Sequence, residues 1–346
     1  MKIGNRHIGK DHKPLFIAEI GINHNGSLQI AKEMVDAAYR AGVEMVKHQT
    51  HIPEAEMSKK VASAVVPQHT SESIFEIIKN CSLSEDEELD LMNYVESKGM
   101  IFISTPFSLE AIDRLEKFKV KAYKIGSGEM KNFPMLKKIC ETGKPLIMST
   151  GMHSLEEVEE SVSFIKSNNP STELAILHTT NLYPTPNHLV RLGAMQDLLD
   201  KFPNIPIGLS DHTITNHSSY GAICLGASVI EKHFTDTKNR IGPDIICSVD
   251  EQMCRELLEG INICTEQRGG TKNRIPEEED TRNFAFATAT VLKNINKGDA
   301  FTRQNIGLKR PSLGDYNSNT IHELFGKVSG RDLLEGDQIK FSDVQS

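Results

Sequence analysis

The sequence contains no long apolar segment, few cysteines and fewer basic than acidic residues. No run of about 18 or more apolar residues occurs, which argues against a membrane-spanning helix. Residues 1–7 lack the apolar core of a secretory signal peptide. The six cysteines include no Cys-x-x-Cys pair, so we expect reduced thiols and a cytoplasmic protein. The formal charge of −8 argues against a general binder of nucleic acids or membrane surfaces, so an anionic substrate has to be held by local cations.

Length and composition are those of a soluble protein with one large domain and one small one. The chain has 346 residues, of which 38% are hydrophobic and 25% are charged. From residue 15 onward, strand-like apolar runs alternate with amphipathic helices. The eight predicted strands cover residues 15–20, 43–46, 100–106, 122–129, 145–151, 174–181, 208–214 and 228–235. Eight regular units predict an α/β fold, a (β/α)8 TIM barrel, in preference to a doubly wound open sheet.

Polar residues cluster where each predicted strand ends, which is where a (β/α)8 barrel carries its active site. These strand ends contribute Glu19, Lys47, Gln49, Thr105, Lys124, Ser127, Glu129, Ser149, Thr150, Asn181, Ser210, His212 and His233. Each residue taken alone is an ordinary turn or capping residue, but clusters at all eight ends predict a site. The lysines and hydroxyls could cradle a phosphate or a carboxylate. Glu19, Glu129 and Asp244 are candidate acid–base groups.

Two histidines lie at the ends of the last two predicted strands. His212 follows the first of these strands and His233 ends the second, about one helix later. Parallel neighbouring strands end on the same side, so the two imidazoles should face each other across the rim. Two imidazoles could hold a divalent metal and leave positions open for substrate. A phosphate cradle beside such a metal suggests metal-assisted carbon–carbon chemistry on a phosphorylated substrate.

The chain changes character after residue 265. A polar, charged segment is followed by short apolar runs separated by Lys-Gly, Leu-Gly-Asp and Glu-Gly-Asp turns. We therefore expect a catalytic barrel at residues 1–275, a linker at 276–284 and a small, mostly β module at 285–346. A module of this size is marginal alone and should dock on another surface.

Many motifs along the chain resemble the bacterial sialic acid synthase (N-acetylneuraminate synthase) family. The motifs are Glu19-Ile-Gly-Ile-Asn-His-Asn-Gly, Lys47-His-Gln-Thr-His, Ser104-Thr-Pro-Phe, Lys124-Ile-Gly-Ser-Gly-Glu, Ser149-Thr-Gly-Met, Thr180-Asn-Leu-Tyr-Pro-Thr-Pro, Leu209-Ser-Asp-His-Thr, Glu231-Lys-His-Phe-Thr and Gly242-Pro-Asp. Leu308-Lys-Arg-Pro and Leu313-Gly-Asp resemble the antifreeze-like SAF domain of that family. The resemblance covers essentially the whole chain.

The resemblance implies condensation of phosphoenolpyruvate with N-acetylmannosamine and water, which gives N-acetylneuraminate and phosphate. It implies a divalent metal on His212 and His233, typically Mn²⁺, with Mg²⁺ or Co²⁺ as alternatives. The metal would polarise the open-chain aldehyde that the phosphoenolpyruvate methylene carbon attacks. Water activated by Glu129 or Asp244 would then add to the former enol carbon, and phosphate would leave with C–O cleavage.

The resemblance also assigns roles to individual residues. Glu19, Glu129, Asp244, His212 and His233 are implied as catalytic. The implied phosphoenolpyruvate site consists of Lys47, Thr105, Lys124, Ser127, Ser149, Asn181 and Ser210. Gln49, Tyr183 and Arg310 are implied to contact the sugar, with Glu19 and Asp244 beside them. Family members form swapped homodimers, so Arg310 would reach the sugar in the partner's barrel.

One departure from the family pattern leaves the sugar open. Met130-Lys131-Asn132 stands where relatives often carry Cys-Asn-Asn, next to the sugar pocket. A close alternative is therefore a synthase for a related nonulosonic acid such as N,N'-diacetyllegionaminate, made from a 2,4-diacetamido-2,4,6-trideoxy hexose. The Lys-His-Gln-Thr-His motif favours the neuraminate type. Two alternatives of other classes are a non-catalytic sugar- or ice-binding protein and an aldolase with a Schiff base on Lys124 or Lys47.

Overall fold

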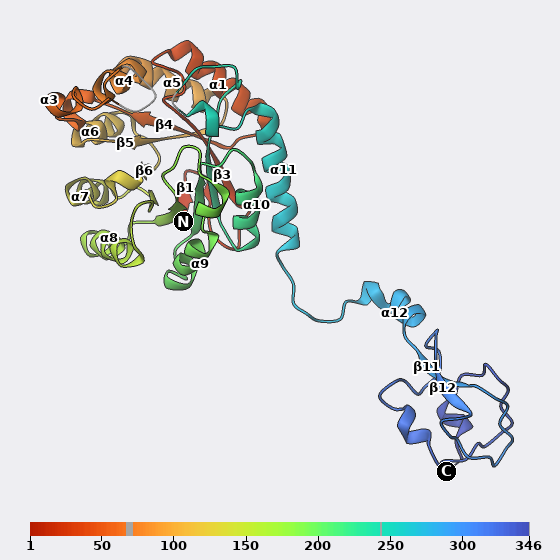
Figure 1. Cartoon of the computed structure of the whole chain (residues 1–346). Helices are drawn as coiled ribbons and strands as arrows, with labels where there is room; N and C mark the ends of the chain where they lie inside the picture. The colour runs from red at the N-terminus through yellow and green to blue at the C-terminus, as the bar shows by residue number, and fades with distance from the viewer. Residues whose placement is uncertain (67–71, 243, 346) are drawn as a thin grey trace. The chain divides into compact units, whose positions relative to one another are not determined.

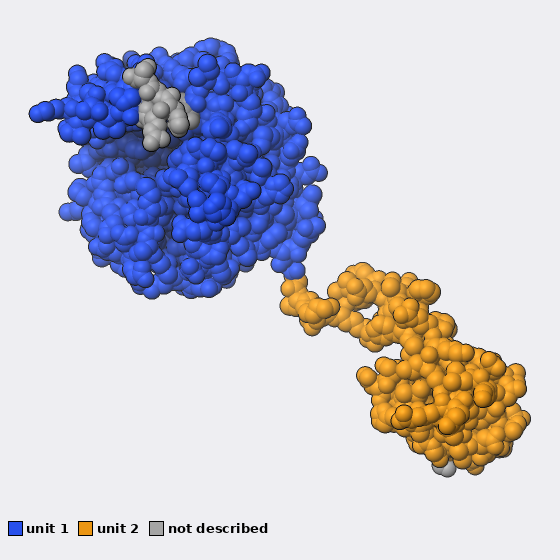
Figure 2. All heavy atoms as spheres, in the orientation of Figure 1, with its two compact units in different colours: residues 1–269 blue, residues 270–346 orange. Residues whose placement is uncertain are grey.

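The structure is a computed structural model that describes residues 1–66, 72–242 and 244–345. The chain forms two compact units, residues 1–269 and residues 270–346 (Figure 2). The division falls at the Gly269–Gly270 pair, a few residues before the boundary expected from the sequence. No helix among the described residues is both long enough and apolar enough to cross a membrane.

The first unit is a closed barrel of eight parallel strands, as predicted (Figure 1). The strands are β3 (Leu15–Gly21), β4 (Met45–Thr50), β5 (Ile101–Pro106), β6 (Tyr123–Ile125), β7 (Leu146–Ser149), β8 (Leu174–Thr179), β9 (Ile207–Asp211) and β10 (Val229–His233). Strand β10 pairs with both β9 and β3, which closes the barrel. This closure distinguishes the fold from the doubly wound open sheet.

Helices follow the strands and surround the barrel. They are α1 (Leu28–Ala41), α2 (Pro53–Glu56), α3 (Lys59–Ala62), α4 (Ile74–Cys81), α5 (Glu85–Ser97), α6 (Leu109–Phe118), α7 (Phe133–Thr142), α8 (Leu155–Asn168), α9 (Leu192–Lys201), α10 (His217–Cys224) and α11 (Glu251–Gln267). Two of these helices begin with capping boxes: Ser84 with Glu87 opens α5, and Ser154 with Glu157 opens α8. Helix α1 begins after the N-cap Ser27 and ends at Gly42, whose φ of 91° suits glycine.

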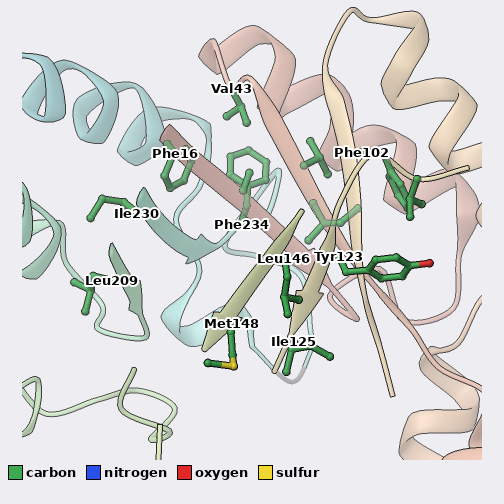
Figure 3. Close-up of a cluster of buried hydrophobic side chains, with 14 of the residues drawn as sticks. Phe16, Val43, Phe102, Tyr123, Ile125, Leu146, Met148, Leu209, Ile230 and Phe234 are labelled. Atoms are coloured by element: carbon green, nitrogen blue, oxygen red, sulfur yellow. The ribbon is translucent and has the colours of Figure 1, made fainter. Parts of the chain in front are cut away.

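Strand side chains alternate between two hydrophobic layers. One set points outward and packs under the helices, as shown for Phe16, Phe102, Leu146 and Ile230 in Figure 3. The other set fills the barrel interior and consists of Leu15, Ile17, Met45, Ile103, Ala122, Ile147, Ala175, Leu177 and Val229, together with Ile3 and Ile8. These interior residues are all apolar, so the polar side chains of a site can gather only at the C-terminal end of the barrel.

A short antiparallel hairpin precedes the barrel. Strands β1 (Lys2–Ile3) and β2 (Arg6–His7) pair with each other. The buried side chains of Ile3 and Ile8 extend the interior core at the N-terminal end of the barrel. The sequence reading missed this hairpin because two-residue strands carry no usable periodicity.

The second unit is a small, mostly β domain. It contains η4 (Pro276–Glu278), α12 (Glu279–Ala285) and an antiparallel pair of strands, β11 (Thr288–Val291) and β12 (Ile306–Lys309). Its separate core is built from Ala289, Val291, Ile295, Phe301, Ile306, Tyr316, Leu324, Leu333 and Ile339. Most of the segment expected to be a linker, residues 276–284, is helical.

Candidate active site

A cavity of about 150 Å³ opens at the C-terminal end of the barrel interior. All eight strands, or the residues just after them, contribute to its wall. The lining residues are Glu19, Lys47, Gln49, Thr105, Phe107, Lys124, Gly126, Ser127, Gly128, Ser149, Thr179, Asn181, Tyr183, Ser210, His212, Glu231 and His233. The barrel thus brings together most of the site residues predicted from the sequence, and an almost entirely polar layer lies on an apolar one.

Two buried lysines, Lys47 and Lys124, line this cavity. Lys124 Nζ donates a hydrogen bond to Ser149 Oγ over 2.6 Å, and Lys47 Nζ donates to Thr105 Oγ1 over 3.2 Å. Lys47 also forms an ion pair with the Glu19 carboxylate. Burial lowers the pKa of Lys47 to about 7 and also lowers the pKa of Lys124. Bound anionic oxygen would favour the charged form of both groups.

Glu231 supplies the counter-charge for the lysines. Its carboxylate lies 3.7 Å from Lys124 Nζ and 4.0 Å from Lys47 Nζ, and it accepts a hydrogen bond from Ser210 over 2.9 Å. Burial alone would raise the pKa of Glu231, but the two lysines and Ser210 outweigh it, and the net shift is downward. Glu231 is therefore held as a carboxylate.

A tight contact between the segments that follow β6 and β7 shapes the wall beside Lys124 and Ser149. The Gly151 N–H donates to Ser127 Oγ over 2.9 Å. A Cβ atom at position 151 would collide with the Asn181 side chain, so glycine is required there for this close approach. Asn181 Oδ1 is buried without a hydrogen-bond partner, which leaves it available to a ligand.

The two rim histidines have the properties of metal ligands. Their ring centroids lie 5.4 Å apart. His212 Nδ1 lies 2.8 Å from the Thr180 carbonyl, to which it donates, and this leaves Nε2 with its lone pair free. Burial lowers the pKa of His212 to about 4 and that of His233 to about 3, so both rings are neutral at pH 7. His233 Nδ1 is buried without a hydrogen-bond partner, so this pair fits a divalent metal.

The remaining predicted site residues lie around the cavity mouth or outside it. The Tyr183 ring stacks on His212 with a centroid distance of 4.2 Å. Asp244 Oδ2 lies 3.6 Å from His233 Nδ1, and burial raises the pKa of Asp244. Its neighbour in the motif, Pro243, lies outside the described residues. Glu129 is not among the lining residues, and its carboxylate accepts a hydrogen bond from Asn132 over 2.8 Å.

Arg310 belongs to the second unit. There it lines a separate surface cavity together with residues such as Arg282, Phe286 and Asn317.

Met130 and Lys131, which depart from the family's sequence pattern, have side chains that lie away from the cavity lining. The Met130 side chain is buried in the outer core. Lys131 points to α8, where it pairs with Glu160 over 2.8 Å. Neither side chain lines the cavity.

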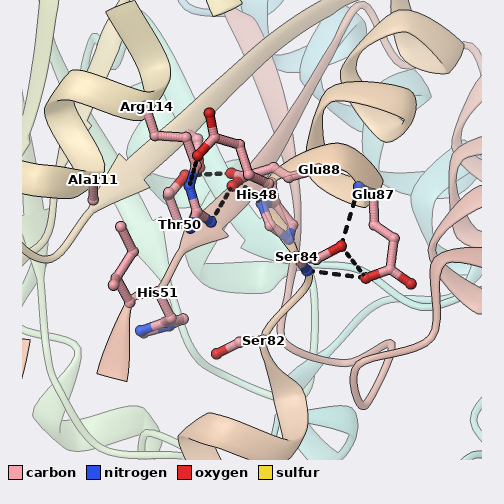
Figure 4. A network of polar contacts seen from close by, with 12 residues as sticks. His48, Thr50, His51, Ser82, Ser84, Glu87, Glu88, Ala111 and Arg114 are labelled. Atoms are coloured by element: carbon pink, nitrogen blue, oxygen red, sulfur yellow. Dashed lines mark hydrogen bonds and ion pairs between the residues drawn. The ribbon is translucent and has the colours of Figure 1, made fainter. Parts of the chain in front are cut away.

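A polar network lies behind β4, on the side away from the cavity (Figure 4). The Glu88 carboxylate contacts Thr50, His48 and Arg114, with His48 Nδ1 at 3.1 Å and Arg114 Nη1 at 3.2 Å. The other ring nitrogen of His48 lies 3.2 Å from His24. His24 and His48 therefore act within the fold, and the network fixes the strand that carries Lys47.

Five lining residues are absent from the site predicted from the sequence: Phe107, Gly126, Gly128, Thr179 and Glu231. The signal was available, because residues i and i+2 of a strand share one face, so Glu231 points inward with His233. Lys232 points the other way and forms a buried ion pair with Asp211 over 3.0 Å.

The fold is a closed barrel of parallel strands whose cavity contains two buried lysines and two histidines. Comparison with known proteins shows the family to which the chain belongs. Residues 34–273 match the model of the NeuB family, and residues 287–345 match that of the SAF domain. The chain therefore belongs to the NeuB family of sugar-acid synthases and ends in an SAF domain.

Relatives match over nearly their full length. The chain is 39% identical to an uncharacterised protein of Methanocaldococcus jannaschii, over 99% of this chain and 98% of the relative. It is 36% identical to the N,N'-diacetyllegionaminic acid synthase of Campylobacter jejuni, over 95% of this chain and 99% of the relative. The N-acetylneuraminic acid synthetase of Leptospira borgpetersenii superposes with a TM-score of 0.73 at 26% identity, covering 81% of this chain and 94% of that one. Because these relatives differ in product, family membership does not fix the sugar.

Proposed function

We propose that this protein condenses phosphoenolpyruvate with an N-acetylated amino-hexose and water, and releases a nonulosonic acid and phosphate. The observation that carries the proposal is the pair of buried lysines with Glu231 on one wall of the cavity, facing the neutral pair His212 and His233. The lysines suit a phosphate-bearing anion, and the imidazoles suit a metal that binds an aldehyde oxygen. One cavity thus offers separate places for the two substrates.

The phosphoenolpyruvate side follows from the hydrogen-bonding groups. Lys124, Ser127, Ser149, Asn181 and Ser210 are proposed to hold the phosphate, with Lys47 and Thr105 beside them. Charged donors shielded from water offset the charge of the phosphate throughout the reaction, including the moment when it leaves. Because these groups are already in place, little reorganisation is needed when the substrate binds.

The metal is proposed to bind His212 and His233. Once bound, it would supply a Lewis acid that polarises the sugar aldehyde. The described residues contain no cluster of three or more His, Cys, Asp and Glu side chains around such an ion, so substrate and water would complete its coordination. The Thr180 carbonyl would keep the His212 ring in the tautomer that ligation requires.

Bond changes in this reaction balance without any redox partner. The methylene carbon of phosphoenolpyruvate forms a bond to the aldehyde carbon as the C=O π bond opens, and the aldehyde oxygen takes up a proton to become a hydroxyl. Water adds to the former enol carbon and releases a proton, which balances the one taken up. The C–O bond to phosphate then breaks, and the electron pair leaves with phosphate. A carboxylate must accept the proton of the water. Asp244, beside His233, and Glu129 are the proposed candidates, and Glu19 lines the same cavity next to Gln49.

Two sugars are candidates for the second substrate. N-acetylmannosamine would give N-acetylneuraminate, and the Lys47-His-Gln-Thr-His motif favours this sugar. A 2,4-diacetamido-2,4,6-trideoxy hexose would give N,N'-diacetyllegionaminate, and the 36% identity to the Campylobacter jejuni enzyme of that name favours this one. Met130 and Lys131 do not line the cavity, so their departure from the pattern decides nothing between the two.

A swapped homodimer completes the proposal. The second unit carries Arg310 on its own surface, and a small domain with an exposed arginine is suited to cover the barrel of a second copy. Arg310 of one copy would then contact the sugar in the other.

The decisive experiment measures phosphate release from phosphoenolpyruvate in the presence of Mn²⁺. N-acetylmannosamine and its 2,4-diacetamido-2,4,6-trideoxy analogue are compared, each with and without EDTA. We expect chelator-sensitive turnover with one of them, and the preferred sugar names the product. No turnover with either sugar would overturn the proposal in favour of a non-catalytic binding protein. An adduct trapped by borohydride on Lys124 or Lys47 would instead support a Schiff-base aldolase.

A further inference from the structure

We propose that His51, held by Glu56, is a positioning residue that orients Gln49 and Phe107 on the sugar side of the cavity. The inference rests on the proposed function, because it assigns a purpose to residues outside the site already described. His51 and Glu56 do not line the cavity, whereas both residues that His51 contacts do.

The first contact fixes the side-chain amide of Gln49. Gln49 Nε2 donates to Glu19 Oε1 over 3.2 Å, and Gln49 Oε1 lies 3.0 Å from His51 Nε2. A flip of the amide would place its oxygen against the Glu19 carboxylate and its amino group against an N–H of His51. The amide therefore has one orientation, which Glu19 fixes at the nitrogen and His51 fixes at the oxygen.

Glu56 holds His51 in the state that this orientation needs. His51 Nδ1 lies 2.9 Å and 3.1 Å from the two carboxylate oxygens of Glu56. The ring therefore lies between the Glu56 carboxylate at Nδ1 and the Gln49 amide oxygen at Nε2, and the side chains of His51 and Glu56 are both buried. Helix α2, Pro53–Glu56, is the single turn that brings Glu56 back to the ring.

The second contact is to Phe107. The His51 and Phe107 rings stack with a centroid distance of 4.2 Å and an interplanar angle of 11°. A flat stack of an imidazole on an aromatic ring is favourable and restricts the rotation of both rings. His51 thus supports two adjacent wall residues at once.

This arrangement has a consequence for recognition. With its oxygen engaged by His51, Gln49 offers an amino group to the cavity and not a carbonyl. It can therefore recognise only an acceptor on the sugar, such as a hydroxyl or acetamido carbonyl oxygen. Loss of the orientation should weaken sugar binding and leave phosphoenolpyruvate binding intact, because the lysine side of the cavity has its own contacts.

The test compares His51→Phe and Glu56→Gln with the wild type in steady-state phosphate release, using whichever sugar turns over. Phenylalanine keeps an aromatic ring over Phe107 but cannot hydrogen-bond to Gln49. Glutamine at position 56 keeps an acceptor for Nδ1 and removes only the charge. A matched control is His178→Phe, since His178 is as buried as His51 but bonds only to the Val190 carbonyl, at 2.7 Å.

We expect His51→Phe to raise the KM for the sugar about tenfold, the usual scale for one lost polar contact, with the KM for phosphoenolpyruvate within about twofold of wild type. Glu56→Gln should change the sugar KM in the same direction by about threefold. In a Gln49→Ala background, His51→Phe should have no further effect on the sugar KM. Equal rises in both KM values, or additive effects of the Gln49 and His51 substitutions, would overturn the proposal.

Crystal structures of the wild type and His51→Phe provide a readout that does not need turnover. We expect the Gln49 amide to be reoriented or disordered in the variant. An unchanged Gln49 would overturn the inference, even if the enzyme proved active. Conversely, absence of turnover in the wild type would count against the proposed function, and the two crystal structures would still decide the role of His51.

Discussion

Glu231 Oε1 lies 3.7 Å from Lys124 Nζ, and both side chains are buried at the bottom of the cavity. Lys47 lies on the other side of this carboxylate and also pairs with Glu19, so two carboxylates accompany the two lysines before any substrate has bound. An anionic substrate would bind to lysines that these carboxylates already hold in place.

Replacement of Glu231 by glutamine should destabilise the free protein. A buried ion pair that loses one partner leaves an uncompensated charge, at a cost of about 3 kcal/mol. Added phosphate should restore much of the lost stability, because the anion takes over the role of the carboxylate. Thermal melts of wild type and Glu231→Gln with and without phosphate check this. If phosphate stabilises both proteins equally, Glu231 does not balance the anion site.

Lys124→Met should abolish most activity while leaving the fold intact. Methionine fills the space but cannot donate to Ser149 or to a bound anion. We expect a loss of at least about 100-fold in kcat/KM for phosphoenolpyruvate, which is the scale for one buried charged donor to a developing anion. Lys138→Met, at an exposed ion pair with Asp113, is the control and should leave kinetics unchanged. A rise in the KM for the sugar, with kcat/KM for phosphoenolpyruvate unchanged, would contradict the assignment of Lys124 to the phosphoenolpyruvate site.

Metal binding should depend on both rim histidines. We expect His212→Ala and His233→Ala each to weaken Mn²⁺ binding at least about 100-fold, since each removes one of two protein ligands. Isothermal titration with Mn²⁺ alone measures this without any turnover, and His178→Ala serves as the control. A His212→Ala protein that kept full activity in EDTA would exclude a role for the metal.

Swapped dimers can be detected by mixing two inactive chains. Arg310→Ala damages the second unit, and His212→Ala damages the barrel. In a mixed swapped dimer, the intact barrel of the Arg310→Ala chain would be covered by the intact second unit of the His212→Ala chain. Co-expression should therefore recover about a quarter of wild-type activity, because half of the dimers are mixed and each has one good site. Activity no greater than that of the separate variants would show that each chain serves its own barrel.

His24 should make stability depend on pH. Burial and the neighbouring His48 lower the pKa of His24 in the folded protein to about 3, from about 6.5 in an unfolded chain. Because the folded form resists protonation, the stability contribution is full above about pH 6.5 and is lost as the pH falls toward 3. At pH 5 the loss is about 2 kcal/mol.

Urea unfolding at pH 7 and pH 5 measures this loss, and His24→Gln is the comparison. The variant should be less stable at pH 7, because glutamine does not reproduce the ring contacts of His24 with His48 and with the Gly26 N–H. Its stability should fall less between the two pH values. An identical pH dependence in the two proteins would show that other groups control it.

The sequence predicted the barrel because each unit repeats the same local pattern. Alternating apolar strands and amphipathic helices with capping boxes at Ser84 and Ser154 are properties of neighbouring residues, so they can be read without a structure. The rim could also be predicted, since parallel strands must end on the same side. The position of His212 beside His233 therefore follows from the sequence.

Contacts between distant segments could not be predicted in this way. The short hairpin at Ile3 and Arg6, the burial of Glu231 between two lysines and the stacking of His51 on Phe107 each depend on side chains brought together only when the barrel closes. Likewise, Glu129 lies in a conspicuous motif, yet its carboxylate accepts a hydrogen bond from Asn132 outside the cavity lining.

The sequence by itself determined the eight-stranded barrel, the small C-terminal domain and the residue types at the rim, because strand periodicity and motif spacing are local. Only the tertiary structure decided which rim residues share one cavity, which carry charge there and which support the others from behind. Those properties depend on burial and on distances of a few ångströms between side chains whose strands are far apart in the chain. Such distances are set only when the barrel closes.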